Sequence, residues 1–362
     1  MRHSMGVEDR SLQTRASSQT SVCVAQYLYV HRQGDSYRYP SARSSGTVAQ
    51  LAARYLECAL VQAASLRVNA PSCRLALVTN VREGDSLSGR GRALLECLER
   101  LGVELVHADY RHAPRAETPH FHSSRYVLDA IEAIVPRLSD GEQLWLLDLD
   151  CVWVDPAAAF AALQPGEGIG ALAIGYPEGW EVSGRTREEL GAIGARLGAC
   201  DPLPHWIGGE LLAGTGAQLL EVLHECERLE AELAQIDVEL ATEEHLLTVA
   251  GGLGRLRFTD LAGTIGRIWT GHRHEASNPS DPAALAIWHL PSEKGLSLRR
   301  AANALLSGRE RRLLRDLADR ERAARRFSVA GAGYARRLRD DGWIVSSRVR
   351  DAVARKLKAL RA

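Results

Sequence analysis

The chain has 362 residues, of which 45% are hydrophobic and 25% are charged, and its formal net charge at pH 7 is zero. This composition is that of an ordinary globular protein, long enough to bury one large core or two smaller ones. A balanced charge gives no global field that attracts nucleic acid or an anionic membrane, so no nucleic-acid partner is expected.

The seven cysteines are scattered and show no C-x-x-C spacing, which argues against a zinc site and against a secreted disulfide framework. They are Cys23, Cys58, Cys73, Cys97, Cys151, Cys200 and Cys226. The sequence shows neither a secretory signal nor an apolar run of about 18 residues, so a cytoplasmic location without a transmembrane segment is expected. The abundance of Gly, Ala, Arg and Leu with little Lys suggests a high-GC, bacterial coding sequence.

The polar residues 1–20 predict a disordered tail, and structure is expected to begin with a strand at 22–30. A polar loop at 31–45 and a helix at 48–66 follow. Strands are then predicted at 74–79, 104–107 and 144–149, with helices at 91–101 and 123–138. This alternation predicts an α/β fold with a mostly parallel sheet flanked by helices.

The pattern changes after the strand at 144–149. A short strand at 171–176 and a glycine-rich apolar segment at 206–216 precede a helix at 217–236. Another helix is expected to open at Glu243 with Thr242 as its N-cap. The last predicted strand spans 284–289.

From Leu298 onward the chain is helical in pattern and rich in arginine. The arginines of this part include Arg299, Arg300, Arg309, Arg311, Arg312, Arg315, Arg325 and Arg326. We interpret 298–362 as a helical C-terminal extension that caps a catalytic domain at 21–297. A surface that recruits an acidic acceptor or an anionic lipid is the alternative.

Two aspartates, Asp148 and Asp150, directly follow the apolar run Leu144–Leu147. The run predicts a buried parallel strand, and ligands gather beyond the carboxyl ends of such strands. Two carboxylates this close repel each other unless a cation lies between them, and Mg²⁺ and Mn²⁺ take oxygen ligands. The pair therefore predicts a cation that bridges the protein to phosphate.

In the order of their elements and motifs, residues 22–295 resemble the GT-A nucleotide-sugar glycosyltransferases, most of all the glycogenin-like, family 8 type retaining group. The resemblance implies a Rossmann-like GT-A domain in which Asp148, Asp150 and His289 hold Mn²⁺ or Mg²⁺. It also implies that Lys294 holds the donor diphosphate. Lys294 follows His289 after four intervening residues, and the Pro-Trp that often comes next in the family is missing.

The same resemblance implies roles for six further positions. Arg125 matches a basic residue against the donor phosphates, and Asp148 also contributes to donor binding. Gly208 and Gly209 match a stretch that lines the sugar and acceptor pocket, although Glu210 follows them where the family commonly has Asn-Ala-Gly. Glu244 is placed near the reacting sugar carbon and Glu243 near the sugar hydroxyls, and which of Glu210, Glu243 and Glu244 acts in catalysis stays open.

The implied function is metal-dependent transfer of a hexosyl or pentosyl group from a nucleoside-diphosphate sugar, a UDP-sugar above all, with retention of configuration. The acceptor could be a saccharide, a lipid, a peptide or a small natural product. A haloacid-dehalogenase-like phosphatase is the main rival, with Asp148 as nucleophile and Asp340-Asp341 as its late acidic pair. A binding module without turnover is the second rival.

Overall fold

The computed structural model describes residues 21–31, 47–82, 87–114, 122–164, 166–199, 204–270 and 278–329. The predicted tail at 1–20, nearly all of the predicted loop at 31–45, Asp340-Asp341 and the rest of the chain beyond Val329 lie outside these residues. No helix of the described part is both long enough and apolar enough to cross a membrane.

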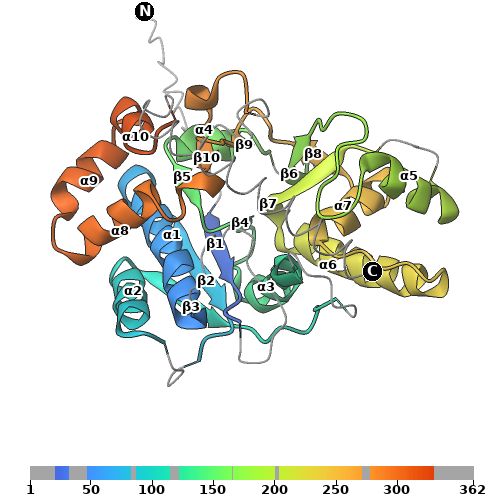
Figure 1. Ribbon diagram of the computed structural model, residues 1–362, viewed down its shortest axis with the longest axis horizontal. Helices are drawn as coiled ribbons and strands as arrows, with labels where there is room; N and C mark the ends of the chain where they lie inside the picture. The colour runs from blue at the N-terminus through green and yellow to red at the C-terminus, as the bar shows by residue number, and fades with distance from the viewer. Residues whose placement is uncertain are drawn as a thin grey trace, which may run out of the picture.

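A seven-stranded sheet forms the centre of the molecule, in the order β3-β2-β1-β4-β7-β6-β8 (Figure 1). Its strands are β1 (Val22–Leu28), β2 (Arg74–Thr79), β3 (Val103–His107), β4 (Gln143–Leu147), β6 (Ile169–Ile174), β7 (Trp206–Thr215) and β8 (Phe258–Asp260). Neighbouring strands from β3 to β4 run parallel, β7 runs antiparallel to β4 and β6, and β8 is parallel to β6. The mostly parallel, helix-flanked sheet predicted from the sequence is confirmed.

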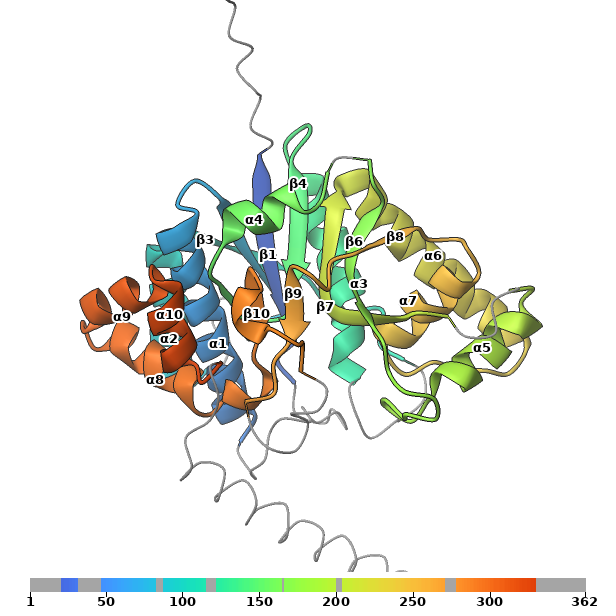
Figure 2. The same cartoon turned by 90° about the horizontal axis from the view of Figure 1, so that it is seen from above.

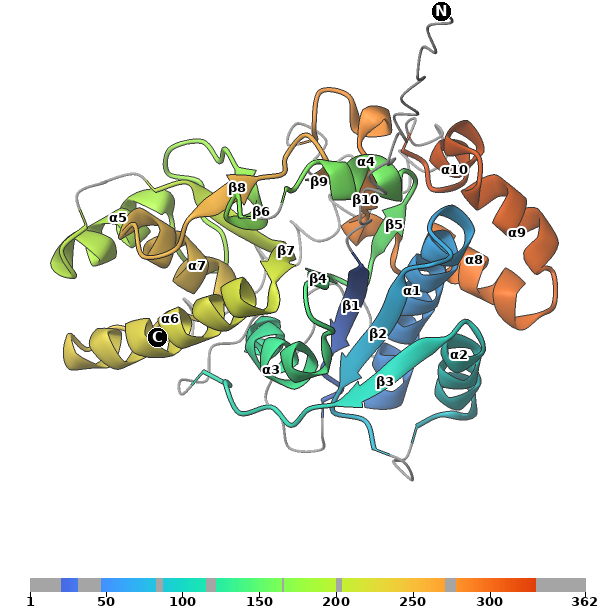
Figure 3. The same ribbon diagram turned by 180° about the vertical axis from the view of Figure 1, so that it is seen from behind.

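Helices cover the sheet in two groups, each with its own apolar cluster (Figure 2). The helices are α1 (Val48–Asn69), α2 (Gly89–Arg100), α3 (Tyr126–Ile134), α4 (Pro156–Ala161), α5 (Arg187–Arg196), α6 (Gly216–Gln235), α7 (Glu243–Gly252), α8 (Ser297–Leu306), α9 (Glu310–Leu317) and α10 (Arg320–Arg326). One cluster joins α1 and α2 with α8, α9 and α10, and the other joins α3, α5, α6 and α7. Figure 3 shows α1 beside β1, β2 and β3.

Capping explains where the helices around the site begin. Thr242 accepts a hydrogen bond from the His245 backbone N–H, as an N-cap does, so α7 starts at Glu243 as predicted. The helix predicted at 123–138 is shorter than expected. It is α-helical only over Tyr126–Ile134 and has a 3₁₀ turn at each end, the second containing Pro136, whose ring lacks the N–H that an α-helix needs.

A second, three-stranded sheet begins with β5, shortly after the end of β4. Its strands are β5 (Cys151–Trp153), β9 (Ile265–Arg267) and β10 (Ile287–His289), in the order β5-β10-β9. The strand predicted at 284–289 is therefore shorter at its start, because residues 282–284 form a 3₁₀ turn that opens on Pro282. In this sheet His289 lies level with Cys151 on one side and with Arg267 on the other.

The described part of the Arg-rich region belongs to the same body as the sheet. Helix α8 packs against α1 and α2, and α9 packs against α1. Leu298, Leu313 and Phe327 are buried in the same apolar cluster as Leu56 of α1. These helices therefore cover α1 with their apolar side chains.

Candidate active site

Asp148, Asp150 and His289 come together at the carboxyl end of β4. Their nearest oxygen and nitrogen atoms all lie within 4.8 Å of one another. The His289 Nε2 atom is 3.5 Å from an Asp148 oxygen and 3.3 Å from an Asp150 oxygen. Asp150 and His289 are buried, whereas the Asp148 side chain is 34% exposed, so the cluster opens toward solvent on the Asp148 side.

Backbone pairing explains how residues 139 positions apart in the chain meet. Strand β5 follows Asp150 directly and pairs with β10, and the Leu290 N–H donates to the Asp150 carbonyl over 2.9 Å. On the other side, the Asp148 N–H donates to the Glu210 carbonyl over 3.0 Å, which continues the pairing of β4 with β7. The two aspartates are thus held between the two sheets.

Lys294 reaches the same cluster from the turn that follows β10. Its Nζ atom is 3.2 Å from the Asp150 carboxylate and 5.2 Å from the centre of the Tyr55 ring. Burial would lower the pKa of Lys294, but the carboxylate of Asp150 outweighs it and raises that pKa above its usual range. Burial likewise acts to raise the pKa of Asp150, yet Lys294 and then His289 lower it below its usual range. Both groups are therefore charged at neutral pH.

The residues of this cluster fit a divalent cation. One Asp150 oxygen and both ring nitrogens of His289 are buried and have charged neighbours but no well-aligned hydrogen bond, although buried polar atoms nearly always have one. Two carboxylates with one imidazole form a donor set that suits Mn²⁺ and also Mg²⁺. Asp148, Asp150 and His289 are the residues that would hold such an ion.

Three further carboxylates lie beside this cluster, on β7 and at the start of α7. Glu210, Glu243 and Glu244 are the catalytic candidates from the sequence, and Glu210 and Glu243 are buried. The glycines before Glu210 leave the space that these side chains fill, because a Cβ atom at Gly208 would meet the Glu210 carboxylate and one at Gly209 would meet the Glu243 carboxylate.

Glu243 and Glu244, the two carboxylates at the start of α7, have pKa values well above the usual range. Burial raises the pKa of Glu243 to about 7, and the nearby charge of Asp148 adds to the shift. Burial and then the charge of Glu243 raise the pKa of Glu244 to about 8. Glu244 is fixed in place by hydrogen bonds from the Trp206 indole N–H, at 2.8 Å, and the Gly209 backbone N–H, at 3.1 Å.

Arg267 joins two of the candidate carboxylates and was not identified from the sequence. Its guanidinium forms ion pairs with Glu210 and Glu244 and donates to the Tyr176 hydroxyl over 2.6 Å. The strand that carries it has only three residues, and no sequence pattern marks it. Its position follows from the pairing of β9 with β10, which sets Arg267 beside His289.

Tyr27 is a second functional candidate that sequence reasoning missed. Its hydroxyl donates to Asp148 over 2.8 Å and lies 3.3 Å from the Gly209 carbonyl, so it ties the aspartate pair to β7. Burial and then the charge of Asp148 raise its pKa well above the usual value, which keeps the hydroxyl protonated as a donor. Its place near the carboxyl end of β1 was the signal that could have identified it.

Arg125 is buried rather than facing an open pocket. It closes the 3₁₀ turn before α3, and its guanidinium forms an ion pair with Glu230 of α6. The charge of Arg125 still acts on Glu243, whose pKa it lowers slightly against the effect of burial. A role at the donor phosphates stays a prediction for Arg125.

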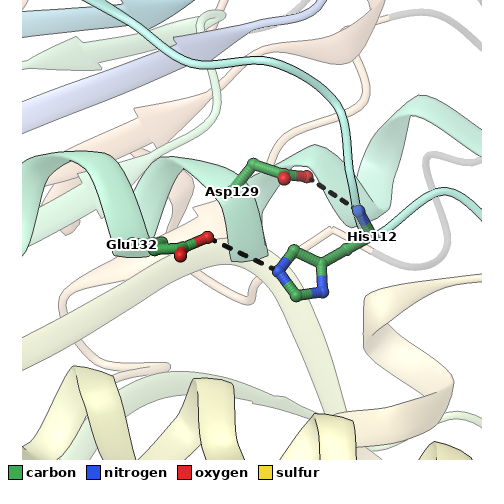
Figure 4. Close-up of side chains that lie close together, drawn as sticks. All are labelled: His112, Asp129 and Glu132. Atoms are coloured by element: carbon green, nitrogen blue, oxygen red, sulfur yellow. Dashed lines mark hydrogen bonds and ion pairs between the residues drawn. The ribbon is translucent and has the colours of Figure 1, made fainter.

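His112, Asp129 and Glu132 form a second group of potential metal ligands, which shares no residue with this site (Figure 4). Asp129 is buried and accepts backbone hydrogen bonds from Arg111, at 2.8 Å, and His112, at 3.3 Å. Glu132 is an ion-pair partner of Arg111 and lies 3.8 Å from the His112 ring. These contacts attach the segment after β3 to α3, so the group has a structural role that explains why its members lie close together.

No family model and no curated protein sequence matches this chain. Solved structures with a similar fold include the galactosyltransferase LgtC in complex with donor and acceptor sugar analogs, which is 15% identical, covers 82% of this chain and 95% of that chain, and has a TM-score of 0.46. An active-site mutant of LgtC is 14% identical, with 79% and 95% covered and a TM-score of 0.46.

The apo structure of the bifunctional glycosyltransferase WbbM is 10% identical, covers 75% of this chain and 46% of that chain, and also has a TM-score of 0.46. Because the similarities are distant, the side chains of the site carry the functional argument below.

Proposed function

We propose that this protein is a metal-dependent glycosyltransferase that moves a sugar from a nucleoside-diphosphate sugar to an acceptor hydroxyl. The observation that carries the proposal is the meeting of Asp148, Asp150 and His289 within 4.8 Å, with Lys294 in contact with Asp150. A cation site beside a buried lysine, at the carboxyl end of a parallel strand, suits a diphosphate.

The charges of the site support a cationic cofactor. Among the described residues, five carboxylates form one connected group, and Lys294 and Arg267 are the cations in direct contact with it. The carboxylates are Asp148, Asp150, Glu210, Glu243 and Glu244. A divalent cation, when bound, would offset the charge of the two aspartates and act as a Lewis acid on the leaving diphosphate.

In the proposed reaction, the bond between the sugar carbon and the diphosphate oxygen breaks, and a bond from that carbon to the acceptor oxygen forms. Lys294 offers its charge to the diphosphate as negative charge develops there. Tyr27 keeps Asp148 oriented through its hydrogen bond. The Arg125 guanidinium is paired with Glu230, so we propose that Arg125 acts on the donor phosphates only through its charge and not by direct contact.

The carboxylates of β7 and α7 are proposed to face the sugar. Positive charge builds up on the reacting carbon, and a nearby carboxylate stabilises it. We assign this role to Glu244, because the ion pair with Arg267 stabilises its charged form against the effect of burial. Glu210 shares the Arg267 guanidinium, and Glu243 is proposed to face the sugar hydroxyls. Gly208 and Gly209 are proposed to keep this wall of the pocket open, because a side chain at either position would occupy the space of a carboxylate.

The finer parts of the proposal are a UDP-linked donor, Mn²⁺ as the preferred ion and retention of configuration, all taken from the sequence resemblance. In a retaining reaction the acceptor proton passes to the departing diphosphate, so no carboxylate base is required. The acceptor stays open among saccharides, lipids, peptides and small natural products.

A thermal-shift screen tests the proposal. The protein is heated with UDP, GDP, ADP, CDP and their sugars, each with Mn²⁺ and with chelator. We expect a stabilisation by one nucleoside diphosphate that requires the metal and that Asp150→Ala removes. Asp140→Ala, an exposed aspartate in the turn before β4, is the matched control and should respond as the unmodified protein does.

The product then identifies the reaction. Incubation of the stabilising sugar nucleotide with Mn²⁺ and a mixture of saccharides should release a nucleoside diphosphate. Release of inorganic phosphate instead would support the phosphatase, and metal-dependent binding without any turnover would support a binding module. Stabilisation by no nucleotide at all would contradict the proposal.

A further inference from the structure

A hollow of about 570 Å³ lies between side chains of α8, α9 and α10 and shares no lining residue with the candidate active site. Figure 1 shows these three helices together at one side of the molecule. We call this space the arginine hollow. It is lined by Ser297, Arg300, Arg312, Arg315, Asp316, Arg322, Arg325 and Arg326. None of these residues belongs to the cluster around Asp148, and the volume is in the range of small-molecule sites.

The lining of the arginine hollow is strongly positive in a chain without net charge. Six arginines face a single acidic residue, Asp316, although lysine plus arginine equals aspartate plus glutamate in the whole sequence, at 45 each. Like charges gathered around one concave surface repel one another and concentrate a positive potential there. Such an arrangement attracts anions.

Most of these guanidiniums are available to a ligand. Arg300 and Arg312 have no acidic group within ion-pair distance among the residues that the structure describes, and both are exposed. Arg322 and Arg325 form only exposed ion pairs, with Asp319 at 3.4 Å and Glu321 at 3.5 Å. Exposed pairs of this kind contribute little stability and exchange readily for a better partner.

The backbone that carries the arginines is firmly held. Ser297 donates to the buried Glu293 from its backbone N–H and from its hydroxyl, which fixes the start of α8. On α9 the buried residues are Leu313 and Leu317, and on α10 they are Ala323 and Ala324. The charged side chains therefore project from a preorganised frame, which lowers the entropy that ligand binding costs.

We infer that the arginine hollow binds a compact soluble anion that carries several phosphate groups, at a site separate from the proposed donor site. The planar fork of arginine matches phosphate oxygens with two parallel hydrogen bonds. The lining holds no aromatic side chain on which a nucleic-acid base could stack and no aliphatic side chain to insert into a bilayer. A small multivalent phosphate fits both the charge and the polar lining.

To test this, inorganic triphosphate is titrated into the full-length, metal-stripped protein at low salt, and the heat of binding is measured by isothermal titration calorimetry. Stripping the metal removes the ion that donor binding at Asp148 is proposed to need. We expect one site, with an affinity that falls steeply as salt rises. Arg300→Glu and Arg312→Glu should each weaken it about tenfold, since each loses a charge-assisted contact.

Arg311→Glu is the matched control, because Arg311 is exposed on α9 next to Arg312 but does not line the hollow. It makes the same change in total charge and should leave the affinity within about twofold of the original. Arg312→Gln, which removes the charge without reversing it, should give an intermediate loss of triphosphate affinity. This variant replaces Arg312→Glu in the test if the reversed charge impairs folding. Circular dichroism checks that each variant is folded.

Three results would overturn the inference. The first is no binding of triphosphate, and the second is an equal loss in Arg311→Glu, which would mean a diffuse charge effect. The third is binding only to vesicles that contain phosphatidic acid, which would assign the surface to a membrane. Metal-dependent nucleotide binding is measured on Arg300→Glu in parallel. If it is retained while triphosphate binding is lost, the arginine hollow and the proposed donor site are separate sites; if no protein binds nucleotide, only the proposed function is contradicted.

Discussion

The guanidinium of Arg267, on β9, bridges Glu210 of β7 and Glu244 of α7. The two glutamates stand 34 positions apart in the chain and on different elements, and Glu210 is fully buried. The guanidinium compensates the charge of the buried Glu210 and links it to the start of α7. Arg267 therefore holds together the wall that we propose to face the sugar.

Arg267→Ala should lower the free energy of unfolding by about 3–5 kcal/mol, because it leaves a buried carboxylate without its partner. Chemical denaturation measures the loss. Arg82→Ala is the control, since Arg82 pairs with Asp109 on the surface, where both side chains are more than half exposed, and it should cost no more than about 1 kcal/mol. Equal losses in the two variants would show that the Arg267 bridge adds nothing particular.

His289→Ala should weaken Mn²⁺ binding by about 100-fold or more, because it removes one of three proposed ligands and even indirect ligand support is worth 10- to 100-fold. Titration of the metal-free protein with Mn²⁺, followed by electron paramagnetic resonance, measures the affinity. His107→Ala, at an exposed position of β3, is the control. An unchanged affinity would assign His289 a purely structural role.

Glu244→Gln should reduce turnover far more than donor affinity, because the carboxylate charge matters most when positive charge builds up on the sugar. The amide keeps the size of the side chain, and its one carbonyl oxygen can still accept from either Trp206 or Gly209, which bond different oxygens of Glu244. Steady-state kinetics with the identified donor separate kcat from KM. A normal kcat would move the role to Glu210 or to the substrates themselves.

Gly209→Ala should displace Glu243, since the added Cβ atom would occupy the place of its carboxylate. We expect a loss of about 1–3 kcal/mol in stability together with a fall in turnover. Gly175→Ala is the matched control, because nothing lies within 4 Å of a Cβ atom built at Gly175. Unimpaired turnover in Gly209→Ala would argue against a role for Glu243.

His245 should make the protein less stable in mild acid. Burial lowers the pKa of His245 to about 4 from the usual 6.5, although its ring contacts the Val182 carbonyl at 3.1 Å. Between these two pH values the unfolded chain binds a proton that the folded protein does not, so acidification favours unfolding, by at most about 3 kcal/mol near pH 4.

Denaturant unfolding at pH 7, 6 and 5 measures this dependence, and His245→Gln should flatten it. His107→Gln, which removes an exposed histidine, should leave the slope as it is. A slope that is the same in all three proteins would show that burial of His245 does not govern acid stability.

Local sequence patterns determined much of this protein. The apolar run before Asp148 predicts β4, the strand–helix alternation predicts the parallel half of the sheet, and Thr242 marks the start of α7. These features depend on neighbours in the chain, where hydrophobic period and capping act directly. The candidate metal residues could be named because the aspartates follow a strand and the family resemblance supplied His289.

The tertiary structure alone decided which charges meet. The antiparallel pairing of β10 with β5 brings His289 to Asp150, and the pairing of β9 with β10 brings Arg267 between Glu210 and Glu244. Strands of three residues carry too little period to be recognised, and the partner of a buried charge is set by packing in space. For the same reason, only the fold could show that Arg125 is paired with Glu230 and that six arginines of three helices surround one hollow.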